Sequence, residues 1–129
     1  MSAVVIEHRA NDTKGSTERK GDTMVRVVIE HKVKDIQLVE KFIDVIREVR
    51  NEAMKQKGFI TGETLVNIDD PTNVLVLSTW ESADDWNGWD TAEIRLKLKP
   101  QINELLSEPY SVRKFHYYLV QQRRVRTIF

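Results

Sequence analysis

The sequence predicts one α+β domain, from about residue 24 to about residue 120, with the element order strand, helix, strand, strand, helix, strand. Three observations carry this prediction. Residues 25–33 are rich in β-branched side chains, as in a strand. Residues 36–53 repeat apolar side chains at three- and four-residue steps, as along one face of a helix. Residues 74–80 are almost wholly apolar, which is typical of a strand buried on both faces.

Composition narrows the class of protein. The chain has 129 residues, 40% apolar and 31% charged, which suits a single folded domain. Lys plus Arg and Asp plus Glu each number 20, so the net charge is zero and no nucleic-acid partner is expected. The lack of cysteine excludes disulfides, thiolate metal sites and a cysteine nucleophile. Neither a signal-peptide pattern nor a membrane-length apolar run is found, so we expect a cytoplasmic protein without a membrane partner.

The first helix has recognisable signals at both ends. Asp35 is a suitable N-cap, and Gly58 is a suitable stop after two lysines. The apolar positions between them form one stripe: Ile36, Val39, Phe42, Ile43, Ile46, Val49 and Ala53. A helix with one apolar stripe packs that stripe against the rest of the core.

Residues 59–67 and 74–80 are expected to form an antiparallel hairpin. The segment between them contains Asp69-Asp70-Pro71-Thr72-Asn73, which reads as a turn because proline fixes its own φ.

Two helices are expected after the hairpin. Ser82 with Asp85, and Asp90 with Glu93, both have the spacing of a capping box. The second helix has its own apolar stripe: Ile94, Leu98, Ile102, Leu105 and Leu106. Pro100 is expected to kink or split this helix, because proline removes one backbone donor.

Both ends of the chain extend beyond the domain. Residues 1–23 form an N-terminal extension that ends in a polar linker, and residues 121–129 form a basic tail. Val4-Val5-Ile6-Glu7-His8 is repeated identically at residues 27–31. Residues 3–9 are therefore either an extra strand that pairs with a sheet edge or a leader with an accidental match.

The order of the elements leaves one face of the sheet uncovered. With a last strand predicted at residues 110–120, the order βαββαβ gives a ferredoxin-like sheet with both helices on one face. In the third strand Val74 and Val76 face one side, whereas Leu75 and Leu77 face the other. Because an apolar uncovered face invites association, we expect a homodimer whose sheets pack together. The enclosed space is expected to hold a small apolar or aromatic ligand.

Several short motifs resemble a known family. They are Val25-Arg26-Val27-Val28-Ile29, Gly58-Phe59, Asp69-Asp70-Pro71 and, above all, Val76-Leu77-Ser78-Thr79-Trp80-Glu81-Ser82. With them, the stretch from Met24 to Tyr118 resembles the antibiotic biosynthesis monooxygenase domains of the dimeric α+β barrel superfamily. The resemblance implies a dimeric barrel and one of several activities: cofactor-independent oxidation of electron-rich aromatic rings, haem degradation or isomerase-like chemistry.

Three tryptophans are the candidate substrate-binding residues. The resemblance implies that Trp80 faces the ligand pocket, where an indole offers a flat apolar wall and one N–H donor. The alternative is that Trp80 only packs between its strand and the helices. Trp86 and Trp89 lie three residues apart on one helix face and either line the mouth of the pocket or plug the end of the barrel.

Oxidation without a cofactor requires that the substrate loses a proton and that its anion is stabilised. His116, as a base, and Arg95, as a cation, are the candidate catalytic residues. Each has a structural alternative, as a half-exposed strand histidine and a solvated helix arginine. Asn67 and Tyr117 are further candidates for substrate binding. His31 and His116 are expected at opposite ends of paired strands, so no metal site between them is expected.

The haem-degrading branch is the weaker match. The resemblance places a strand-one Asn, the strand-three Trp and a His on the following helix in those relatives, but strand one here has Glu30 and His31, and residues 86–99 contain no His. No cofactor is therefore expected. Three hypotheses stay open: a cofactor-independent monooxygenase acting on a small aromatic or phenolic substrate, a non-catalytic ligand-binding or regulatory dimer, and a haem-binding or haem-degrading protein.

Overall fold

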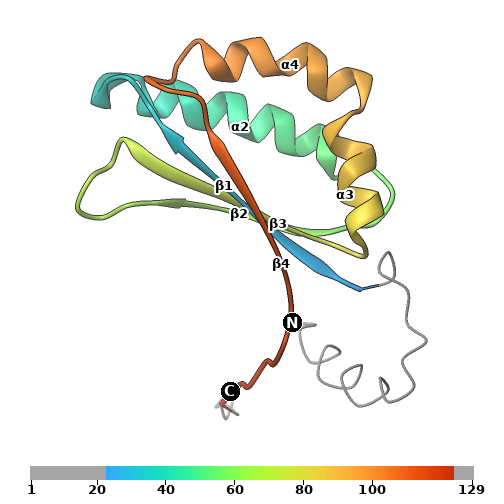
Figure 1. The fold of residues 1–129 in the computed structure, drawn as a ribbon. Coiled ribbons are helices and arrows are strands. Elements are labelled where there is room, and N and C mark those ends of the chain that lie inside the picture. The colour runs from blue at the N-terminus through green and yellow to red at the C-terminus, as the bar shows by residue number, and fades with distance from the viewer. Residues whose placement is uncertain (1–22, 124–129) are drawn as a thin grey trace, which may run out of the picture.

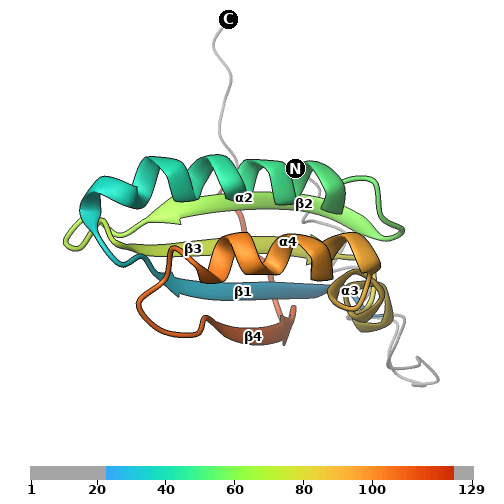
Figure 2. The ribbon, with the colours of Figure 1, turned by 90° about the horizontal axis from the view of Figure 1, so that it is seen from above.

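Two layers make up the structure, a four-stranded sheet and a layer of helices on one of its faces (Figures 1 and 2). This computed structural model describes residues 23–123. The elements are β1 (Val25–Lys32), the 3-10 turn η3 (Ile36–Leu38), α2 (Val39–Ala53), β2 (Phe59–Val66), β3 (Asn73–Trp80), α3 (Ala83–Asp90), α4 (Glu93–Asn103) and β4 (Ser111–His116). The predicted α+β class and βαββαβ order are confirmed.

The strands lie in the order β2-β3-β1-β4, and every neighbouring pair is antiparallel. Val25 pairs with Trp80 on one side and with His116 on the other, which fixes the register across the centre of the sheet. Because side chains alternate along a strand, Val25, Val27, Ile29 and His31 all point to the helix layer, and all are buried.

The helices bury most of each stripe that the sequence predicts, but Ile36 lies in η3 and is 53% exposed. Phe42, Ile46, Val49 and Ala53 of α2 are buried. Leu98 and Ile102 of α4 are buried too, and α4 lies beside α2 above the sheet (Figure 2). The core therefore lies between the sheet and these two helices.

Local signals set most of the element ends. The Asp35 side chain accepts a hydrogen bond from the Gln37 backbone N–H at 2.9 Å and caps η3, the short turn before α2. Gly58 precedes β2 with a φ of 85°, in the left-handed region that glycine adopts freely. The Ser82 hydroxyl accepts from the Asp85 N–H at 3.1 Å, as the predicted capping box requires.

The predicted start of α4 at Asp90 is wrong, and of the two effects expected of Pro100 the split is absent. Asp90 does not cap this helix: it is the last residue of α3, and the N-cap of α4 is Ala92 without a side-chain bond. Pro100 does not split α4, which runs from Glu93 to Asn103. The proline lies in the last turn, so few backbone bonds follow the one it removes.

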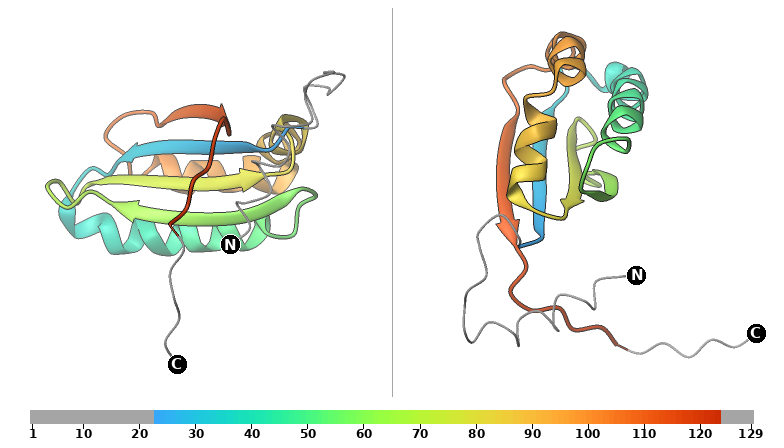
Figure 3. Two further views of the ribbon diagram at one scale, coloured as in Figure 1. Left: turned by 90° about the horizontal axis from the view of Figure 1, so that it is seen from below. Right: turned by 90° about the vertical axis from the view of Figure 1, so that its right-hand side faces the viewer.

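The opposite face of the sheet carries no helix (Figure 3). β4 ends at His116 rather than at residue 120, and all of its residues are exposed. The chain then turns across the open face, where the Tyr117 hydroxyl lies 3.2 Å from that of Thr79. The sheet is not closed within one chain. The predicted extra strand at residues 3–9 lies outside the described residues, as does most of the basic tail.

None of the helices between residues 23 and 123 is long and apolar enough to cross a membrane.

Candidate functional site

A cavity lies between the sheet and the helices. Its volume, measured for the centre of a water molecule, is about 40 Å³. That is room for about three waters. Aliphatic side chains and five aromatic ones line it; the aromatic residues are Phe59, Trp80, Trp86, Trp89 and Tyr110. The polar side chains that reach it are His31, Arg50, Ser78 and Arg95, and no carboxylate from residues 23–123 joins them.

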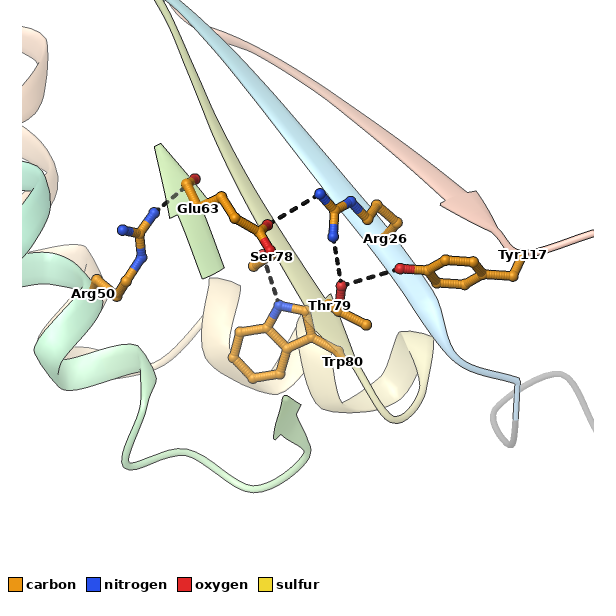
Figure 4. A network of polar contacts seen from close by, with 7 residues as sticks. All are labelled: Arg26, Arg50, Glu63, Ser78, Thr79, Trp80 and Tyr117. Carbon is orange, nitrogen blue, oxygen red and sulfur yellow. Dashed lines mark hydrogen bonds and ion pairs between the residues drawn. The ribbon is translucent and has the colours of Figure 1, made fainter. Parts of the chain in front are cut away.

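Trp80 forms the wall at the end of β3. It is fully buried, and its ring makes edge contacts with Phe59 at 5.3 Å and with Trp86 at 6.0 Å between centroids. Its Nε1 donates to the Ser78 hydroxyl at 2.9 Å (Figure 4). Because this bond uses the single indole donor, Trp80 offers a ligand an apolar surface.

Arg95 places a cation inside this aromatic lining. It is only 4% exposed, and its Nε donates to an Asp90 carboxylate oxygen at 3.3 Å. Its guanidinium carbon lies 5.7 Å from the Trp86 ring centroid and 5.5 Å from that of Trp89, within the range of cation–π attraction. Within the described part of the chain, its two terminal nitrogens have no hydrogen-bond partner. They are available to an anionic group in the cavity.

His31 is the second polar group in the interior. It is 2% exposed, its ring lies 4.9 Å from Phe42 and 5.3 Å from Tyr110, and its Nδ1 makes a long contact of 3.4 Å with the Val74 carbonyl oxygen. Burial lowers the pKa of His31 to about 4; the Arg95 charge acts in the same direction, and the Val74 contact opposes them. The imidazole is therefore neutral at pH 7. If Nδ1 carries the proton for the Val74 carbonyl, Nε2 is the basic nitrogen.

Arg50 lines the cavity from α2. Its Nη2 donates to the Glu63 carbonyl oxygen of β2 at 2.9 Å (Figure 4). Partial burial lowers the pKa of the guanidinium, and the nearby Glu63 charge raises it, so Arg50 stays charged.

The structure brings together four of the residues that the sequence singled out. Trp80, Trp86, Trp89 and Arg95 come from β3, α3 and α4 and all line the same cavity. Arg95 is not a solvated surface residue, because the two tryptophans and Asp90 enclose it.

Three other candidates lie away from the cavity. Asn67 holds the β2–β3 turn: its Oδ1 accepts from the backbone N–H groups of Asp69 and Asp70 at 2.8 and 3.2 Å. His116 is exposed at the end of the edge strand β4. Tyr117 contacts Thr79 on the open face.

Tyr117 belongs there to a small polar network (Figure 4). Arg26 donates to the Thr79 hydroxyl at 3.0 Å and pairs with the Glu63 carboxylate at 3.0 Å. These contacts hold Tyr117 on the face opposite the cavity.

His31 and His116 are separated as predicted. His116 pairs with Val25 at one end of β1, whereas His31 pairs with Val74 at the other end. No group of three or more His, Asp or Glu side chains within residues 23–123 is arranged to hold a metal ion.

Sequence reasoning missed His31, Arg50 and Tyr110 as parts of the site. The signal for His31 was present, because it continues the alternation Val25, Val27, Ile29 on the buried face of β1. Arg50 and Tyr110 reach the cavity through tertiary packing, and no local pattern marks them.

Solved structures share this fold. SnoaB from Streptomyces nogalater, a cofactor-independent oxygenase, superposes with a TM-score of 0.71 at 15% identity, covering 78% of this chain and 99% of that one. A Nitrosomonas europaea protein described as an antibiotic biosynthesis monooxygenase gives a TM-score of 0.68 at 17% identity, covering 78% of this chain and 94% of that one. A conserved protein from Methanosarcina mazei gives 0.67 at 17% identity, covering 73% and 92%.

The sequence itself decides the family. None of the curated proteins matches the chain as a relative. The family described as "Antibiotic biosynthesis monooxygenase" matches residues 24–98, which is more than half of the chain and includes β1, α2, both hairpin strands and α3. The chain belongs to the antibiotic biosynthesis monooxygenase family.

Proposed function

We propose that the protein is a cofactor-independent monooxygenase that oxidises a small phenolic or hydroxyaromatic substrate in the cavity between sheet and helices. The observation that carries the proposal is a buried guanidinium, Arg95, held inside an aromatic lining, with terminal nitrogens that bond no residue between 23 and 123. Family membership and the structural likeness to SnoaB, a cofactor-independent oxygenase, support the reaction class.

The reaction needs only the substrate and molecular oxygen. The ionised substrate transfers one electron to O₂, and the resulting radical and superoxide combine to form a carbon–oxygen bond. The peroxide then loses water, so that a ring CH₂ group and O₂ give a carbonyl group and H₂O. The substrate is the reductant, and no other electron donor is required.

The residues that line the cavity would have different roles in the reaction. Arg95 stabilises the substrate anion, as a fixed cation does for developing negative charge in a dry site. Neutral His31 accepts a hydrogen bond or the departing proton. Trp80, Phe59 and Trp86 hold the ring by apolar and edge contacts. A ring is larger than the cavity as it stands, so side chains of the lining must move outward as the substrate enters.

The test is oxygen consumption with a tricyclic anthrone as substrate. We expect the wild type to consume one O₂ per anthrone and to form the anthraquinone. The variant Arg95→Met keeps the apolar stem of the side chain and removes the guanidinium charge. We expect its kcat to be about 10²–10³-fold lower than that of the wild type. The matched control is Lys97→Met, which removes an exposed cation from the same helix and should leave kcat unchanged.

Other outcomes would favour the competing functions. Equal rates for Arg95→Met and the wild type would contradict the role of the cation. Absence of oxygen uptake, together with saturable binding of the anthrone, would favour the ligand-binding module. A shift of the Soret absorbance band on addition of haemin would favour the haem-binding function.

A homodimer completes this proposal. Register places Val28, Leu65, Leu75, Leu77 and Phe115 on the open face, because residues paired across neighbouring strands share a face. We expect a second copy to cover that face and close the barrel.

A further inference from the structure

Arg50 is the second cation that lines the cavity. It reaches from α2 to the edge strand β2, where its Nη2 donates to the Glu63 carbonyl oxygen at 2.9 Å. Within residues 23–123 this is its only hydrogen bond, because the Glu63 carboxylate pairs with Arg26 instead, at 3.0 Å. Nε and Nη1 of Arg50 are therefore left for a ligand.

A glycine makes room for this side chain. A Cβ placed on Gly62 would lie 2.7 Å from the Arg50 Nε and 3.2 Å from its Cδ. Among the described glycines only Gly58 has a positive φ, so Gly62 is required here by close approach rather than by its backbone conformation. Any larger residue on β2 at this point would push the guanidinium out of its place.

The charge of the lining favours an acid. Two guanidiniums, Arg50 and Arg95, line a cavity whose other polar side chains are neutral His31, Ser78 and Tyr110. No carboxylate of the described residues lines the cavity itself; Asp90 pairs with the Nε of Arg95 at 3.3 Å from outside the lining, and the Glu63 charge acts on Arg50. Burial disfavours both cations, so an anionic ligand gains more here than at the protein surface.

Exposure separates the two cations. Arg95 is 4% exposed and lies among the tryptophans, whereas Arg50 is partly exposed and adjoins the sheet edge. Arg95 therefore suits a group on the buried ring, and Arg50 suits a group at the ring's outer end.

We propose that Arg50 determines substrate specificity: it binds a carboxylate at the outer end of the aromatic substrate, so that the protein selects hydroxyaryl carboxylic acids over neutral phenols. This inference rests on the proposed function in taking the cavity as the substrate site. Arg50 presents a planar fork of donors, which matches a carboxylate better than the point charge of a lysine does.

The test compares two probes that differ in charge and hardly in shape, 6-hydroxy-2-naphthoate and its carboxamide. Calorimetric titration of the full-length wild type should give a Kd at least about tenfold lower for the acid. All three tryptophans of the chain line the cavity, so quenching of tryptophan fluorescence reports whether each probe enters it.

Two variants test the assignment to Arg50. Arg50→Met keeps the apolar stem and should reduce the acid preference to within about twofold. Gly62→Ala keeps the charge but displaces the guanidinium, and it should reduce the preference by at least about threefold. Arg47→Met is the matched control, because Arg47 lies on the same helix with 67% of its side chain exposed; it should keep the full preference.

The outcomes separate this inference from the proposed function. Equal affinity of acid and amide for the wild type, no binding of the acid, or an undiminished preference in Arg50→Met would each overturn the role of Arg50, even if anthrone is oxidised. An Arg50-dependent preference in a protein that consumes no oxygen would support the inference on the ligand and contradict the oxygenase. Thermal melting of each variant identifies any loss of folding.

Discussion

His31 shows how a single buried side chain links stability to pH. The pKa is lowered from 6.5 to about 4, so below pH 6.5 the unfolded chain binds a proton that the folded protein does not. Stability is therefore unaffected by His31 above about pH 6.5, and it falls as the pH drops towards 4. The shift corresponds to about 3 kcal/mol when fully expressed.

We expect the free energy of unfolding, measured in urea between pH 7 and pH 4, to decrease by up to about 3 kcal/mol through this group. His31→Gln should flatten that part of the slope. His116→Gln is the control: this histidine is exposed on β4, and the variant should keep the wild-type slope. A slope that is the same in His31→Gln and the wild type would show that His31 is not held neutral by burial.

At the scale of single residues, the sequence predicted which residues belong to the site better than it predicted how buried each one is. Trp80 was identified by the motif in which it stands, and its place in the cavity follows from the end of β3. The burial of Arg95 could not be predicted, because Asp90 and both tryptophans that enclose it precede it in a separate helix. The location of Asn67 could have been predicted, since an Asn in a turn commonly bonds the backbone N–H two residues further on, here that of Asp69.

At the scale of elements, local sequence signals predicted the position of a helix or strand correctly where no other structure competed for the same residues. The alternation of β1, the stripe of α2 and the cap at Ser82 all lie where the sequence placed them. Asp90 and Glu93 also had capping spacing, but α3 extends through Asp90, whose carboxylate pairs with Arg95 instead. The end of β4 had no local signal, because residues 117–120 are Tyr-Tyr-Leu-Val, which are residue types that strands favour.

Two glycines near these elements predict opposite effects of one substitution. Gly58→Ala should destabilise the protein by at least about 1 kcal/mol, because an L-residue disfavours a φ of 85°. Its Cβ would also collide with the Asp85 side chain. Gly88→Ala should stabilise by about 0.5–1 kcal/mol, since alanine is the better helix former. Gly88 lies in α3 with no atom within 4 Å of an added Cβ.

Thermal or urea unfolding of the two alanine variants measures both effects against the wild type. Each variant serves as the control for the other, because the same methyl group is added. A Gly58→Ala protein as stable as the wild type would contradict the need for glycine before β2.

At the scale of the whole molecule, one chain forms an open sheet that helices cover on one face only. All helices of residues 23–123 lie on one face of the sheet (Figure 3), although strand residues point to both. The sequence anticipated this imbalance from the alternation in β3, where Leu75 and Leu77 oppose Val74 and Val76. It could not show the geometry of a partner, because contacts between two copies leave no periodic pattern in one chain.

Light scattering tests whether a second copy covers the open face. We expect the wild type at micromolar concentration to have twice the chain mass of 15.1 kDa. Leu65→Glu places a carboxylate on the open face, where Leu65 is 50% exposed, and should shift the protein towards monomer because a buried unpaired charge is costly. Leu96→Glu makes the same change at a residue 51% exposed on α4 and should leave the dimer intact. A monomeric wild type, or dissociation caused by Leu96→Glu alone, would show that the open sheet face is not a dimer interface. The apolar side chains on that face would then have to be covered by something other than a second copy.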